Sequence, residues 1–233
     1  MNFNWNLDTI RWYQDANNYT GYFKNIASLI IPKLEGYSTL CDIGCGLGLI
    51  DMEFCKYIEN ITCIDINQEA IKALEKNIKD KNISNISPRL INCDDIEENW
   101  DIIFVSFFGS RNLKNFLPRC KKLIAVVNSE NPTGLFPEKY RPFHKNTCLN
   151  VGENLKKDGI SYDLMEASFE FGQPLVSMED AKNFVRIHSR NNITNEELEL
   201  FLSQRLIETG ETQYPYFIPR MKSVGIFEIQ GEL

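Results

Sequence analysis

Short apolar runs alternate with helix-type patterns along residues 39–128, and this alternation restricts the fold more than any other feature. The fourth run, Ile102-Ile103-Phe104-Val105, is apolar at every position, as in a strand that is covered on both faces. Strands separated by helices at this spacing indicate βαβ units and a parallel sheet. The predicted strands are 39–43, 61–65, 89–93, 101–107 and 123–128.

Apolar residues at helical spacing occur between these runs and again after them. Apolar residues line one face of a helix that Pro32 ends, and Thr194 with Glu197 forms a capping box at the start of a later helix. Residues 129–159 are rich in turn signals and give no clear element. The first ~35 residues are predicted to be helical, and the later predicted helices are 49–58, 67–78, 112–120, 177–187 and 194–207.

Two further strand patterns, 161–171 and 223–230, come after the five βα units. A late strand pair of this kind suggests an antiparallel edge on the sheet. We therefore predict a Rossmann-like, doubly wound α/β fold with a mainly parallel seven-stranded sheet, an antiparallel edge strand and helices on both faces. The expected organisation is a single domain over 1–233, with an N-terminal helical lid at 1–35 and a substrate-side insertion at 129–220.

The net charge, the apolar runs and the cysteine spacing restrict the partners, the location and the metal content that we expect. The formal net charge is −7, which argues against a non-specific nucleic-acid binder but leaves room for a local basic patch. No apolar run reaches the ~18 residues of a membrane span, and the N-terminus lacks a signal-peptide pattern, so we expect a cytoplasmic protein. The seven cysteines follow no metal-ligand spacing, and we predict no metal site.

The segment Asp42-Ile43-Gly44-Cys45-Gly46-Leu47-Gly48 carries the chemistry. A strand that runs through closely spaced glycines into a helix places a nucleotide at the carboxyl edge of the sheet. The glycine spacing differs from the dinucleotide fingerprint, because Leu49 stands where a third glycine belongs. Asp42 would repel a pyrophosphate and attract an amino group. The ligand is therefore expected to have an amino acid end.

Acids also end the second and third predicted strands. Asp65 can accept hydrogen bonds from both hydroxyls of a ribose, and Asp94 or Asp95 can accept one from an adenine amino group. Together with Asp42 they suit a ligand that carries an amine, a ribose diol and an aminopurine.

These segments resemble the class I S-adenosylmethionine-dependent methyltransferases over about residues 20–130. The resemblance implies S-adenosylmethionine as cofactor, with the glycine loop (Gly44 and Gly46) around its methionine part and Ile66 packed on adenine. It also places Ser106, with Phe107, Phe108 and Gly109, beside the sulfonium and the acceptor. The segments that carry it are 42–48, Cys63-Ile64-Asp65-Ile66, Asn92-Cys93-Asp94-Asp95-Ile96 and Trp100-Asp101-Ile102-Ile103-Phe104.

Residues for the acceptor are less sharply defined by the sequence. His144 lies in the irregular region after the fifth strand, where substrate loops are common, and is a candidate general base. The alternative is a structural or solvated histidine. N-terminal aromatic side chains are candidates for substrate contact or a lid, with a packed helix stripe as the alternative: Trp12, Tyr13, Tyr19 and Tyr22.

The expected function is methyl transfer from S-adenosylmethionine to a small-molecule acceptor by in-line displacement. Three alternatives remain open: an RNA methyltransferase, an aminopropyltransferase-like enzyme that uses the same pocket, and a non-catalytic cofactor-binding module. The sequence specifies neither the methylated atom nor the oligomeric state.

Overall fold

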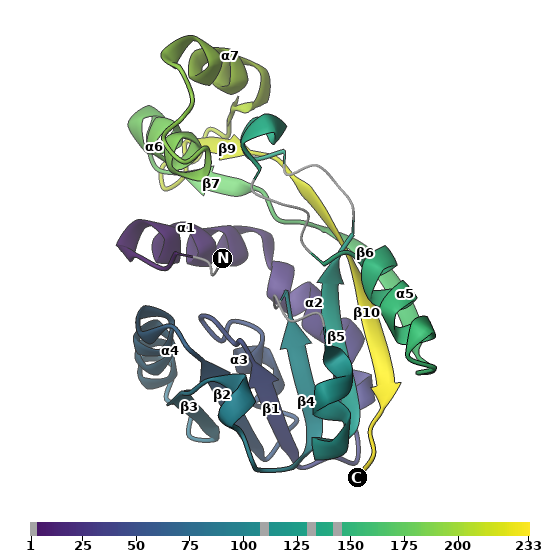
Figure 1. The fold of residues 1–233 in the computed structure, drawn as a ribbon. Coiled ribbons are helices and arrows are strands. Elements are labelled where there is room, and N and C mark those ends of the chain that lie inside the picture. Colours follow the sequence, from purple (N-terminus) through teal and green to yellow (C-terminus); the bar gives the residue numbers. More distant parts are fainter. Residues whose placement is uncertain (1–3, 108–111, 130–133, 142–145) are drawn as a thin grey trace.

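The computed structural model describes residues 4–107, 112–129, 134–141 and 146–233. Its main sheet has seven strands in the order β3-β2-β1-β4-β5-β10-β6 (Figure 1). The strands are β1 (Thr39–Ile43), β2 (Asn60–Asp65), β3 (Ile86–Leu90), β4 (Trp100–Ser106), β5 (Cys120–Asn128), β6 (Asp163–Glu170) and β10 (Met221–Gln230).

The strand directions confirm the predicted fold class. β1 to β5 all run parallel to one another, whereas β10 is antiparallel to both β5 and β6. The antiparallel strand is thus one place in from the edge, which β6 forms. The order reverses at β1, which pairs with β2 on one side and β4 on the other. Ligands of open α/β sheets bind at such a switch point, outside the carboxyl ends of the strands.

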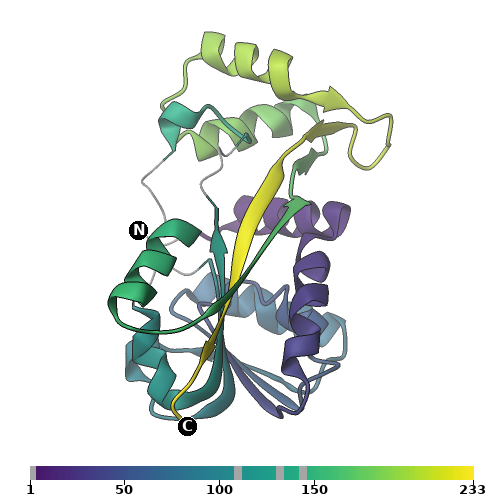
Figure 2. The ribbon, with the colours of Figure 1, turned by 90° about the vertical axis from the view of Figure 1, so that its right-hand side faces the viewer.

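Helices cover both faces of the sheet, as Figures 1 and 2 show. The helical elements are α1 (Leu7–Thr20), α2 (Tyr22–Ile30), η1 (Ile31–Leu34), α3 (Asp51–Phe54), α4 (Gln68–Asp80), η2 (Cys93–Asp95), η3 (Leu113–Arg119), η4 (Glu138–Tyr140), α5 (Cys148–Lys157), α6 (Met178–His188) and α7 (Asn195–Arg205).

Alternate strand residues build two separate cores. Leu40 and Ile102 face α2, α3 and α4, whereas Cys41 and Ile103 face η3 and α5. Successive side chains of a strand point to opposite faces, so a strand that is apolar at every position fills both cores.

A smaller lobe stands beyond the carboxyl edge of the main sheet (Figure 1). It holds a three-stranded antiparallel sheet, β7 (Gln173–Leu175), β9 (Tyr216–Ile218) and β8 (Ile207–Glu208), with α6 and α7. The helix α1 lies between this lobe and the main sheet, and a third core joins α1 to α6 and α7. The sequence reading missed this second sheet because its strands have only two or three residues each.

Several element boundaries differ from the predictions. The helix expected at 49–58 shrinks to the single turn α3, since the glycine loop and its turns extend to residue 50. The third strand is β3 at Ile86–Leu90 rather than 89–93, and Pro88 is tolerated there because β3 is an edge strand. Pro118 accompanies a 3₁₀ helix, η3, where an α-helix was expected, and α5 forms in a stretch that gave no clear element.

Candidate cofactor and acceptor site

The glycine loop follows β1 and depends on left-handed backbone conformations. Gly44 has φ 75°, and Gly46 has φ 55°. Both Gly44 N and Cys45 N donate to Ile64 O, at 2.8 and 3.0 Å, which fixes the loop against the end of β2. At Gly48 a Cβ would lie 2.4 Å from Leu74 Cδ1, so this glycine serves the packing of α4 against the loop.

Asp65 joins the loop to the end of β2. Its Oδ2 accepts from Gly46 N at 3.0 Å, and its Oδ1 accepts from Asn67 N at 2.8 Å. The next residue, Ile66, is 55% exposed, which is unusual for a large apolar side chain beside such a loop. This arrangement gives an open apolar surface next to a carboxylate.

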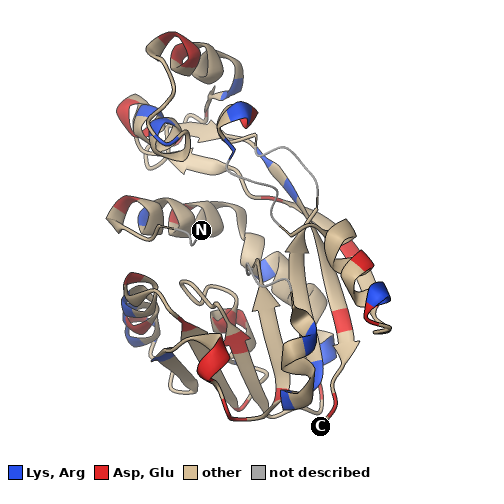
Figure 3. Cartoon of the chain, in the orientation of Figure 1, with Lys and Arg blue, Asp and Glu red and all other residues tan. Residues whose placement is uncertain are grey.

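Asp94 and Asp95 are exposed on η2, which follows the neighbouring strand β3. Parallel strands end at the same edge of a sheet, so these acids share that edge with Asp65. Figure 3 shows acidic residues gathered around the ends of β1 and β2 and on η2.

Asp42 differs from the other acids because it is fully buried beneath the loop. Its carboxyl group faces that of Asp51, which is also fully buried, and the thiol of Cys63 lies beside Asp51. The pair is satisfied when Asp42 keeps a proton and donates it to Asp51. Burial and the neighbouring charge hold the pKa of Asp42 well above its usual range, and burial raises the pKa of Asp51 to about 6.

The four N-terminal aromatic candidates occupy different environments. Trp12 is 2% exposed, donates from Nε1 to Asp180 at 2.9 Å and packs edge-on against Phe184. It is therefore packed in the core of the lobe, as in the alternative of a packed helix stripe, and its contact with a substrate stays a prediction. Tyr19 Oη donates to Glu211, at the rim of the lobe.

Tyr13 and Tyr22 lie on the side of the glycine loop. Both rings pack against Phe171, at 5.4 and 4.3 Å between centroids. Trp5, which the sequence analysis did not select, stacks edge-on against Tyr13, and a Cβ on Gly46 would meet its ring at 3.2 Å. The segment before α1 thus covers part of the loop, a contact that only the tertiary structure reveals.

Ser106 ends β4 and is half-buried at the carboxyl edge. The next residue, Phe107, has φ 53°, a strained conformation for a bulky side chain, and its N–H donates to Val126 O at 2.9 Å. Residues 108–109 and His144 lie outside the described residues, so the expected role of His144 is not addressed by the structure.

Two cationic residues, one directly before β10 and one at its start, also reach this region, and sequence reasoning missed them. Lys222 is 8% exposed, and its Nζ lies 3.4 Å from the centroid of the Phe107 ring. Arg220 lies over the ring of Phe171 at 5.9 Å. The sequence does carry a signal for them: the two cations are two positions apart where an apolar strand begins, and alternate residues of a strand share a face.

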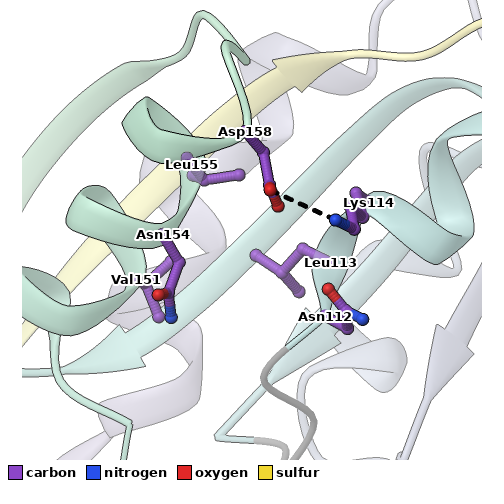
Figure 4. Close-up of a pocket in the computed structure, with 7 residues that line it drawn as sticks. All are labelled: Asn112, Leu113, Lys114, Val151, Asn154, Leu155 and Asp158. Atoms are coloured by element: carbon purple, nitrogen blue, oxygen red, sulfur yellow. Dashed lines mark hydrogen bonds and ion pairs between the residues drawn. The ribbon is translucent and has the colours of Figure 1, made fainter.

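A small hollow between η3 and α5 does not belong to this site (Figure 4). Its free volume is about 10 Å³, which is room for no more than one water molecule. The ion pair of Lys114 and Asp158, at 3.1 Å, crosses it.

Residues 40–126 match a family of proteins described as "Methyltransferase domain". This segment holds the glycine loop, Asp65 and Ser106 together. Residues 40–126 are thus similar to the methyltransferase domains of this family, over less than half of the chain.

The methyltransferase domain also resembles a curated protein of Methanococcus maripaludis, the probable cobalt-precorrin-6B C(15)-methyltransferase (decarboxylating). The two are 28% identical over 90 residues, 39% of this chain, and the chain spans about half the length of that relative.

Solved structures share the fold of the whole chain. The YcgJ protein of Bacillus subtilis superposes with a TM-score of 0.57 at 15% identity, over 90% of this chain and 100% of that one. Magnesium protoporphyrin IX methyltransferase of Synechocystis, solved with bound SAH, superposes with a TM-score of 0.54 at 10% identity, over 99% and 90%. At these identities the similarity establishes the fold of the methyltransferase domain and its surroundings. No helix in the described residues is long and apolar enough to cross a membrane.

Proposed function

We propose that this chain is an S-adenosylmethionine-dependent methyltransferase that acts on a small-molecule acceptor. The observation that carries the proposal is Asp65, held at the end of β2 by the N–H of Gly46 in the glycine loop. A carboxylate at this position, next to the exposed Ile66, suits a ribose diol and a purine ring.

The other residues at this edge fit the same cofactor. Gly44 and Gly46 leave room for its methionine part, because neither carries a Cβ. Asp94 or Asp95 would accept from the adenine amino group, and Ser106 would lie near the sulfonium. Asp42 supports the loop from below, since its carboxyl group is buried against Asp51 and does not line the open edge.

S-adenosylmethionine, when bound, supplies a methyl group that its sulfonium already activates. The protein must then align the acceptor atom in line with that group, and proximity and orientation can contribute up to about 7–11 kcal/mol. The rings of Tyr13, Tyr22 and Phe107 would exclude water from the acceptor side. A general base is needed only if the acceptor atom is protonated at neutral pH.

Calorimetric titration with S-adenosylhomocysteine tests the cofactor assignment. We expect micromolar binding to the wild-type protein and at least tenfold weaker binding to Asp65→Ala, because two ribose hydroxyls lose their acceptor. Asp80→Ala, at the exposed end of α4, is the control and should bind as the wild type does. Absence of binding to the wild type at high micromolar concentration would contradict the proposal.

The alternatives differ in their products or partners. An aminopropyltransferase-like enzyme would transfer a different group, which mass spectrometry of the products distinguishes from methyl transfer. A non-catalytic module would bind S-adenosylhomocysteine and give no product with any acceptor. An RNA methyltransferase would bind tRNA with strong salt dependence, and the net charge of −7 argues against it.

A further inference from the structure

The start of β10 extends beyond the carboxyl end of β5. Val224 pairs with Asn128, the last residue of β5, so the residues before Val224 continue past the edge of the parallel strands. Lys222 lies in this extension and Arg220 directly precedes it, and both lie over the ring of Phe171, at 5.2 and 5.9 Å. Figure 3 shows the basic residues of this part of β10 between the sheet and the lobe.

Aromatic rings surround these two cations. The Nζ of Lys222 lies 3.4 Å from the centroid of Phe107 and 5.0 Å from that of Tyr22. Tyr22 in turn stacks on Phe171 at 4.3 Å with an interplanar angle of 28°. Because Phe107 directly follows β4, the cluster borders the edge where the cofactor site lies.

Two buried polar atoms in this cluster lack a hydrogen-bond partner. They are Nε of Arg220 and Oη of Tyr22, and no described group bonds to either. Both residues pack against the ring of Phe171, Tyr22 at 4.3 Å between centroids and Arg220 at 5.9 Å, which places them near one another. Buried polar groups are normally satisfied, so two orphaned donors at one place indicate an acceptor that comes from outside the chain.

The charges around Arg220 are also unbalanced. Burial lowers its pKa, and the nearby charge of Arg141 acts in the same direction. Glu138 opposes this effect, but it is already paired with Arg141 at 2.9 Å. Arg205 adds a further cation: its guanidinium donates to Pro219 O at 2.8 Å, next to Arg220, and its Nε is likewise buried without a partner. A desolvated cation without a counter-ion is costly, so this site favours an anion.

Building on the methyltransferase function proposed above, we propose that Arg220 and Tyr22 bind an oxyanion of the acceptor, a carboxylate or a phosphate. Arg220 supplies the charge, and the hydroxyl of Tyr22 donates a further hydrogen bond. Guanidinium groups match both oxyanions in geometry.

The test measures binding of three probes with one ring each, by calorimetry with and without saturating S-adenosylhomocysteine. Benzoate carries a carboxylate, phenyl phosphate a phosphate, and benzamide neither charge. We expect one or both anions to bind at least tenfold more tightly than benzamide. The preferred anion identifies the oxyanion of the acceptor.

Variants assign the binding to the cluster. Arg220→Gln should weaken binding of the preferred anion at least tenfold, Arg220→Lys should weaken it less, and Tyr22→Phe should weaken it about threefold while keeping the ring. Arg119→Gln, at the end of η3 on the opposite edge of the sheet, is the matched control and should have no effect. All variants should retain wild-type affinity for S-adenosylhomocysteine, which also reports that they are folded.

Equal affinity for benzamide and the anions, no binding of either anion, or unchanged anion binding in folded Arg220→Gln would overturn the inference. Salt-dependent tRNA binding that requires Arg220 would also overturn it, in favour of a polymeric substrate. A wild-type protein that does not bind S-adenosylhomocysteine would instead contradict the methyltransferase proposal. The dependence of anion binding on Arg220 is then still tested by the titrations without the cofactor.

Discussion

Single residues of this protein act through surroundings that their position in the chain does not reveal. Asp42 belongs to the motif that identifies the cofactor loop, yet its carboxyl group faces Asp51 in the interior. Two carboxyl groups this close, without water, cannot both ionise easily. In the folded chain the residue therefore lies beneath the loop, beside a second buried carboxyl group.

The acid pair predicts an unusual pH dependence of stability. The pKa of Asp51 is raised to about 6 in the folded state, so its carboxyl group binds a proton more tightly in the folded chain than in the unfolded chain. The resulting contribution to the free energy of unfolding is fully present below about pH 4 and is lost as the pH rises through 6. When the pH is raised from 4 to 8, we expect the free energy of unfolding of Asp51→Asn to rise by about 2 kcal/mol relative to that of the wild type.

Urea unfolding of both proteins at pH 4 and pH 8 measures this gain. Asp80→Asn, on the exposed end of α4, controls for the loss of one negative charge. If Asp51→Asn and the wild type change in parallel with pH, the pKa of Asp51 is not raised in the folded state.

At the scale of elements, α1 connects the small lobe to the main sheet. Its polar anchor is Asp180 on α6, which accepts from Arg11 at 2.5 Å, from Trp12 at 2.9 Å and from Val176 N at 3.1 Å. Hydrogen bonds and the charge of Arg11 lower the pKa of Asp180 despite its burial. This contribution to stability is present above the ordinary pKa of an aspartate and is lost as the pH falls through the lowered value.

Asp180→Ala should lower the free energy of unfolding by about 2–4 kcal/mol, because a buried acceptor of three donors disappears. Hydrogen exchange should rise in residues 7–20 more than in β1 or β4. Glu179→Ala, at the exposed neighbouring position, is the control. It should change the free energy of unfolding by no more than about 0.5 kcal/mol and leave hydrogen exchange in residues 7–20 as in the wild type. Faster exchange spread evenly over the chain would show that α1 does not depend on this anchor.

At the scale of the whole molecule, the main sheet, the segment before α1 and the small lobe meet at the carboxyl edge of the sheet (Figure 1). Trp5 lies against the glycine loop, and Arg220 approaches from the strand that returns from the lobe. We propose that residues 1–35 act as a lid and that much of 129–220 shapes the acceptor side. β6 is an exception within that second range, because it completes the main sheet.

Cofactor binding should therefore tighten the N-terminal segment as well as the loop. At one hundred times its dissociation constant, S-adenosylhomocysteine should raise the free energy of unfolding by about 2.7 kcal/mol and the melting temperature by roughly 5–10 °C. Hydrogen exchange should slow in residues 4–20 and 44–49. Protection that is confined to the loop would rule out a lid formed by the N-terminus.

The sequence by itself determined the layers of the main sheet and the position of the cofactor loop. Apolar alternation and glycine spacing are local properties, so strands such as 101–107 and the loop after Ile43 can be predicted from neighbouring residues alone. Parallel strands end at a common edge, and this rule was enough to assign Asp65 and Asp94 to the same edge from separate segments.

Only the tertiary structure decided which polar and aromatic side chains face one another. Trp12 and Tyr22 lie in one aromatic stretch, yet the first packs into the lobe and the second reaches Arg220, nearly two hundred residues away. Such contacts depend on how helices and strands pack across long sequence separations, and no periodicity in the chain encodes them. The buried pair of Asp42 and Asp51 and the cations of β10 have the same origin.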